Sequence, residues 1–292
     1  MSATHLYLGA LAAYLVAALI AALGLKKSDA PRGHAQTIVI AAGIVLHSAG
    51  IGVYCAQAKT HFFTSQAEVL SLFSWSLALG YLGLLAVWRM RVLGILVMPL
   101  SAGLLAAGFF LPAPGPTPSG GVASHPLFAT HVLTAFLGYG LFLTACAASV
   151  VYLQEHRLLK QKTFSILFRG LPSLQQLERA VGLLSWVGLG LFTVAVGTGI
   201  ILAQASGHPE WYREPQVLSA IAVWLVFLVL CIGRLAGRLA GRATAHVVLI
   251  GAGLVLVTFV ISHPFYVKTE DSSKRASVSL DAPANEPGGV RP

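Results

Sequence analysis

The sequence predicts an all-α, polytopic membrane protein, a helical bundle of about eight transmembrane helices. Of its 292 residues, 56% are hydrophobic and 10% are charged, whereas soluble domains are roughly 45–50% apolar and 25% charged. The apolar residues form evenly spaced runs of about 20 residues, which is the length that spans a bilayer. Most of the basic residues lie in short gaps between these runs, where they act as topology signals.

The apolar runs define the expected helices in chain order. The first run follows Met1–His5, which contains no Lys or Arg, so we expect it to remain as an anchor rather than act as a cleaved secretory signal. Each later run is bounded by charged residues or by Pro and Gly, which interrupt helices. The windows predict helices over residues 6–24, 37–56, 68–88, 92–111, 127–152, 180–204, 216–235 and 245–267.

The charges in alternate gaps predict the orientation. The gaps after expected helices one, three, five and seven hold three, two, five and three Lys or Arg residues, whereas the other gaps hold Lys59 and Arg213 alone. Cytoplasmic loops retain positive charge. We therefore expect both termini to lie outside, in the periplasm, and the chain to be a multi-pass protein of a bacterial inner membrane.

The domain organisation is a single transmembrane domain over residues 1–267 and a tail over residues 268–292. The tail is rich in Ser, Pro, Gly, Ala and mixed charge, a composition typical of disorder. The formal charge of +9 is dispersed rather than gathered in one patch, so we expect the lipid bilayer and no nucleic acid as a partner. The three cysteines fall inside apolar runs without a CxxC pair, which favours packing roles.

Three histidines carry the chemistry of the expected helices. No Asp, Glu, Lys or Arg lies deep inside them, but His47 lies near the middle of the second helix, and His131 and His263 lie about one turn from the outer ends of the fifth and eighth helices. At 1.5 Å per residue, His131 and His263 share a depth. Neutral imidazole is a good ligand for iron, so an outward pocket would suit haem with two axial histidines. A hydrogen-bonded contact between helices is the alternative for each.

The outer gap between the sixth and seventh helices concentrates aromatic and ionic residues as WYREP, residues 211–215. An aromatic belt at the lipid interface accounts equally well for Trp211 and its neighbour. Arg213 could pair with a haem propionate, or instead with Glu210 or Glu214.

These residues resemble the cytochrome c assembly family (CcsA/ResC/CcmC-type haem-handling membrane proteins), particularly its smaller YpjD/HemX-like branch. HPLFATHV at residues 125–132 is similar to the family's segment that supplies an outward haem-ligand histidine, so the resemblance implies that role for His131. WYREPQV at residues 211–217, continuing to WLVF at residues 224–227, resembles a reduced form of the family's Trp-rich WWD segment. His263 matches the family's second outward histidine.

The chain also departs from the family pattern. Only Trp211 and Trp224 match family tryptophans, Glu214 stands where the family has Asp, and Ile232 and Gly233 occupy the place of an intramembrane histidine of larger members. His47 resembles a Leu-His-Ala pattern of the smaller branch. The resemblance extends over residues 40–266.

The leading hypothesis is a haem-binding protein of cytochrome c biogenesis that holds haem b, stably or in transit, for delivery to apocytochrome c or an assembly partner. The expected iron ligands are His131 and His263, and the expected cofactor-binding residues are Trp211, Arg213, Glu214, Pro215, Trp224 and His47. We expect no enzyme, because no catalytic constellation is visible. One alternative is a HemX-like membrane regulator of haem-synthesis enzymes without stable haem binding. Another is a small-solute permease, which the lack of buried charge disfavours.

Overall fold

The computed structural model describes residues 2–24, 30–58, 65–111, 125–161, 172–207 and 210–258. Within these ranges there is no strand, and eight helices are long and apolar enough to cross a membrane. This confirms the predicted all-α, multi-pass bundle. The helices are α1 (Ala3–Gly24), α2 (Ala30–Ala58), α3 (Gln66–Trp88), α4 (Gly94–Gly108), α5 (Leu127–Lys160), α6 (Leu174–Ala205), α7 (Pro215–Leu235) and a helix over Gly241–Thr258, here called the final helix.

Helices α5 and α6 are longer than the apolar windows that predicted them. The α5 helix continues to Lys160 instead of ending at residue 152, and α6 begins at Leu174 instead of residue 180. A hydropathy window detects only the stretch suited to hydrocarbon, whereas backbone hydrogen bonding continues into the polar region. Ser173 and Gln176 form a reciprocal capping box that starts α6, and this places its first turn among polar residues.

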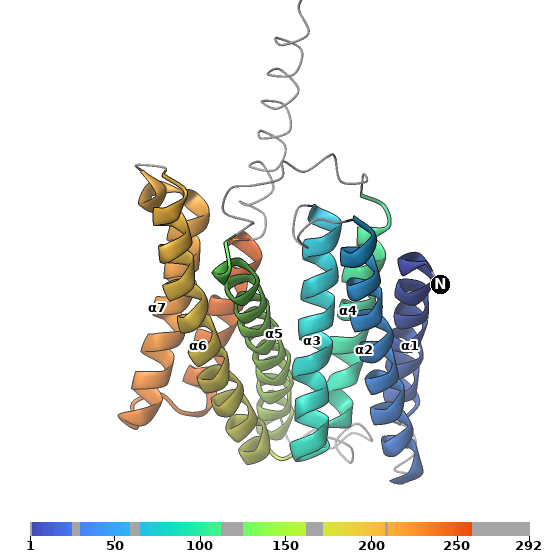
Figure 1. Cartoon of the computed structure of the whole chain (residues 1–292). Helices are drawn as coiled ribbons and strands as arrows, with labels where there is room; N and C mark the ends of the chain where they lie inside the picture. The colour runs from blue at the N-terminus through green and yellow to red at the C-terminus, as the bar shows by residue number, and fades with distance from the viewer. Residues whose placement is uncertain are drawn as a thin grey trace, which may run out of the picture.

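The eight helices form two halves that meet where α3 packs against α5 (Figure 1). In the first half, α1 packs against α2 and α4, and α3 packs against α4; in the second, α5 packs most extensively against α6. The α3 and α5 backbones approach closely at Gly140, where an added Cβ would lie 2.6 Å from the carbonyl carbon of Ser76. Such glycines allow membrane helices to pack without a side chain between them.

The two ends of the bundle differ in charge. Helices α1, α3, α5 and α7 all begin at one end, here called the N-terminal end (Figure 1). Among the side chains that the structure describes, Arg213 is the one Lys or Arg at this end. The other described Lys and Arg residues lie toward the opposite end, here called the basic end. Those at the basic end are Arg89, Arg91, Arg157, Lys160, Arg179, Arg234, Arg238 and Arg242.

Candidate functional site

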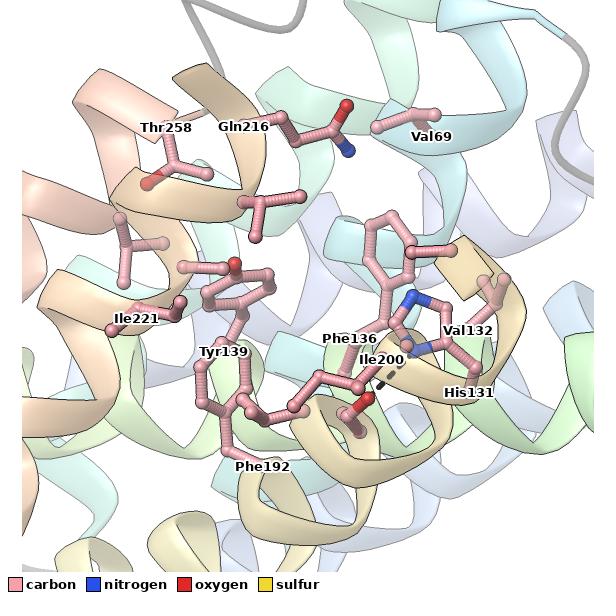
Figure 2. A pocket seen from close by; sticks show the side chains of 18 of the residues that line it. Val69, His131, Val132, Phe136, Tyr139, Phe192, Ile200, Gln216, Ile221 and Thr258 are labelled. Atoms are coloured by element: carbon pink, nitrogen blue, oxygen red, sulfur yellow. Dashed lines mark hydrogen bonds between the residues drawn. The ribbon is translucent and has the colours of Figure 1, made fainter. Parts of the chain in front are cut away.

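A cavity of about 320 Å³ lies toward the N-terminal end of the second half. Its walls come from α3, α5, α6, α7, the final helix and the short turn before α7, and most of its lining side chains are aliphatic or aromatic (Figure 2). Gln66, the first residue of α3, and Gln216, the second residue of α7, both line it, so the cavity extends to the helix ends. The volume is at the lower end of the range for small-molecule pockets, roughly 300–1,000 Å³.

His131 supplies the imidazole of this cavity. Its Nδ1 donates a hydrogen bond of 2.8 Å to the backbone carbonyl of Ala195 on α6. Because a carbonyl can only accept, the proton lies on Nδ1, and in the neutral ring Nε2 keeps its lone pair. Figure 2 shows this second nitrogen turned away from the Ala195 contact, toward the cavity. Metal-binding histidines are typically held in this way, with one ring N–H donating to a carbonyl or carboxylate.

Gly199 makes room for the imidazole of His131. A Cβ at this position would lie 2.8 Å from Cε1 and 3.1 Å from Nδ1 of the ring. Gly199 follows Ala195 by one helical turn, so the two small residues form a shallow face of α6 against which the ring rests. The position of the imidazole therefore depends on a carbonyl and a missing side chain, both on α6.

The cavity walls contain residues that the sequence analysis did not identify. On α5, the lining residues Phe128, Val132, Phe136 and Tyr139 follow one another at spacings of four, four and three residues, which places them on one face of the helix. His131 follows Phe128 by three residues, so this helical periodicity was available in the sequence. Gln66, Gln216 and Phe192 belong to other helices, and only the packing brings them to the same cavity.

The expected Trp-rich segment is divided between two environments. Trp211, in the short 3₁₀ turn η4 (Trp211–Arg213), lines the cavity. Trp224 lies in the third turn of α7, where its Nε1 donates a 2.9 Å hydrogen bond to Thr193 Oγ1 of α6. It lies outside the cavity lining and joins two helices.

The remaining residues of this segment lie at the surface or at the start of α7. Arg213 donates to Glu210 over 3.1 Å, and both side chains are more than half exposed. Of the two ionic partners left open by the sequence, the structure therefore has Glu210. Glu214 and Pro215 are the N-cap and first residues of α7, and neither lines the cavity.

His47 occupies a separate place in the first half of the bundle. It is fully buried, with Nδ1 3.2 Å from Tyr14 Oη and Nε2 2.8 Å from Ser71 Oγ. The ring of Tyr7 meets it edge-on, with 5.5 Å between centroids. Both ring nitrogens of His47 are thus engaged in joining α1, α2 and α3, which is the helix-contact alternative for this residue.

His263 lies outside the described residues, as do the expected helix end at residues 259–267 and the tail at residues 268–292. The final helix brings Val255 and Thr258 to the cavity wall. The expected meeting of His131 with His263 therefore stays a prediction. Within the described ranges, no three His, Cys, Asp or Glu side chains come together, and His131 is the one residue of these four types in the described cavity lining.

These features define a class of protein: a multi-pass membrane bundle in which an anchored imidazole faces an apolar, aromatic cavity. The sequence profile of the cytochrome c assembly protein family matches residues 59–264. This stretch contains His131, His263 and the Trp211 turn, but His47 precedes it. The chain belongs to the cytochrome c assembly protein family.

Two similar relatives are each named Protein HemX. The relative from Brevibacillus brevis is 27% identical over 190 residues, which cover 61% of this chain and 70% of the relative. The relative from Bacillus subtilis (strain 168) is 24% identical over 180 residues, which cover 61% of this chain and 65% of the relative. Both support placement in the HemX-like branch.

Proposed function

We propose that this chain binds haem in the cavity and serves cytochrome c biogenesis by holding haem b for delivery to apocytochrome c or an assembly partner. The observation that carries the proposal is the His131 imidazole, anchored through Nδ1 to Ala195, with Nε2 facing an apolar and aromatic cavity. Haem is flat and largely apolar, and its iron is the atom that such a nitrogen would bind. The residues present therefore fit haem.

His263 is the residue proposed to hold the iron together with His131, because it follows in sequence the final helix whose Val255 and Thr258 reach the cavity wall. Trp211 would cover one side of the ligand. Arg213 would reach a haem propionate by exchanging its exposed Glu210 partner, and Glu214 with Pro215 would set the direction in which α7 leaves the turn.

Two of the proposed residues would act at a distance from the ligand. Trp224 would hold α7 against α6 through Thr193, and His47 would hold the first half of the bundle together through Tyr14 and Ser71. Neither side chain lines the cavity. Their proposed contribution is therefore to keep the cavity walls in place.

The charge of the basic end supports an orientation with the cavity toward the outside. Cytoplasmic ends of membrane helices are enriched in Lys and Arg, and here those residues gather opposite the cavity. In a bacterial inner membrane, the cavity and both termini would then face the periplasm. The chain itself would position haem rather than catalyse a bond-forming step.

A haem titration tests the proposal. The purified protein in detergent is titrated with haem, and the absorption spectrum is recorded for the parent, His131→Ala, His263→Ala and the double variant. His246→Ala is the control, because His246 is exposed on the final helix toward the basic end. We expect a saturable low-spin spectrum that each single variant alters and the double variant abolishes. An unchanged low-spin spectrum in the double variant would reject these ligands.

The second candidate is a HemX-like membrane regulator of haem-synthesis enzymes that binds no haem stably. The observation favouring it is that both relatives described above carry the name Protein HemX. This function predicts that a haem-synthesis enzyme co-purifies with the tagged chain in a fixed ratio and that the complex is colourless. Stoichiometric haem in the purified chain, without such an enzyme, would reject it.

A further inference from the structure

The cavity carries no formal charge on its described lining. None of the described lining residues is Lys, Arg, Asp or Glu. A carboxylate inside it would have no cationic side chain of the lining as its partner, and an unpaired charge within a membrane protein is costly. A haem molecule carries two propionate carboxylates on one edge, so this lining constrains which edge enters.

The polarity of the lining changes along the helix axes. At the N-terminal end, Gln66, Trp211, Gln216 and Thr258 supply amide, indole and hydroxyl groups; we call these four residues the rim. Gln216 is exposed, so the rim reaches the surface. Because the helices are regular, residues further along each wall lie deeper in the bundle.

The deep part is an aromatic cluster, which we call the floor: Phe73, Phe136, Tyr139 and Phe192. The ring of Phe73 meets Phe136 edge-on, with 4.9 Å between ring centroids, and stacks with Tyr139, with 5.7 Å between centroids. The centroids of Tyr139 and Phe192 are 4.7 Å apart. The hydroxyl of Tyr139 is a polar group of this floor, but one neutral hydroxyl cannot balance two carboxylates. From Phe128 to Tyr139, α5 descends by about 16 Å at 1.5 Å per residue.

Building on the proposed haem site, we infer that the ligand enters with its apolar edge first. The two propionates stay at the rim, in contact with water, and the opposite edge lies on the aromatic floor. In haem that opposite edge bears the two vinyl groups, the groups that form thioether bonds with cysteines. The seated ligand is therefore shielded from a protein thiol. This chain would carry haem and release it before attachment rather than present it for attachment in place.

The test compares haem with haem dimethyl ester, in which both carboxylates are neutral. Each ligand is titrated into the parent protein and into His131→Ala in the same detergent. The titration of the variant measures how much ligand enters the detergent micelles without binding through His131. With the carboxylates in water and paired at most with exposed Arg213, we expect the dissociation constants of the two ligands to agree within about fivefold, the range of an exposed ion pair, and His131→Ala to weaken both. A buried carboxylate would instead make the ester bind more than about tenfold differently, tighter if unpaired and weaker if paired.

A charge at the rim gives a second readout. Ala203 lies in the last turn of α6 and lines the cavity. Ala203→Lys should tighten haem binding by about two- to fivefold, the range of an exposed ion pair, and leave the ester unchanged. Ala203→Gln is the uncharged control of similar length and should affect both ligands equally.

The outcomes separate the orientation from the proposed function. If neither ligand shows saturable, His131-dependent binding, the haem proposal fails and the orientation fails with it. If haem binds through His131 but the ester differs by more than about tenfold, the haem site stands and the orientation is wrong. An Ala203→Lys effect that is equal for haem and ester also contradicts the orientation.

Discussion

Gly199→Ala is the substitution that most directly probes how His131 is held. The new methyl carbon would begin 2.8 Å from Cε1 and 3.1 Å from Nδ1 of the imidazole. Ordinary carbon contacts are about 3.5–4.0 Å, so the ring must move by roughly 0.7 Å or more. The ring is at the end of a side chain that can rotate, so the fold is preserved and the position of the imidazole changes. The 2.8 Å bond from Nδ1 to Ala195 is strained or lost in the process.

The expected loss is in ligand affinity rather than in stability. Removing the outer hydrogen bond of a metal-binding histidine typically lowers affinity by about 10–100-fold, and we expect about tenfold here. Gly197→Ala is the matched control, because an added Cβ there meets nothing within 4 Å. Both substitutions bring the same gain in helix propensity, about 0.5–1 kcal/mol. A stability difference between them therefore measures the clash.

The assay is a haem titration of both variants in detergent, with thermal unfolding followed by circular dichroism. Gly197→Ala should bind haem within about twofold of the parent and unfold at the same or a higher temperature. Gly199→Ala should retain helicity and lose affinity. Equal affinity for the two variants would refute the idea that His131, seated against Gly199, positions the ligand.

Three further substitutions, one of them with a matched control, test the surrounding structure. His47→Ala should lower the free energy of unfolding by about 2–4 kcal/mol, because it leaves a buried void and removes the hydrogen bonds to Tyr14 and Ser71; haem affinity should fall with the loosened α3 wall, while the haem that still binds keeps the low-spin spectrum of the parent. Trp224→Phe removes its hydrogen bond to α6 and should cost about 1 kcal/mol in the same unfolding measurement, and a cost of zero would contradict that link. Gly251→Ala places a Cβ 2.6 Å from the buried Phe227 ring, whereas Gly253→Ala meets nothing within 4 Å. The first should lower the melting temperature and the second should not, and equal melting temperatures would show that the final helix does not pack closely here.

The helical bundle follows from local properties of the chain. Runs of apolar residues long enough to span hydrocarbon must form helices, because lipid offers no partner for backbone N–H and C=O groups. All eight helices were therefore visible as hydropathy windows, while the polar extensions of α5 and α6 were not. The alternation of basic gaps also predicted correctly which helix ends lie together.

The candidate site could be predicted only in part, because its residues come from five helices. His131 was identifiable by type and depth, but the Ala195 carbonyl that orients it and the Gly199 gap that admits it are ordinary helix residues until α5 packs on α6. Trp211 and Trp224 looked alike in the sequence, yet one lines the cavity and the other joins α6 to α7.

Hydropathy and charge are properties of individual residues that add up along the chain. The sequence alone is therefore enough to specify membrane insertion, the helix count and the family pattern. Which side chains share a cavity depends on the rotation and contact of whole helices. The same physical difference separates His47 from His131: both are histidines within apolar helices, but packing engages both nitrogens of His47 and leaves Nε2 of His131 facing open space.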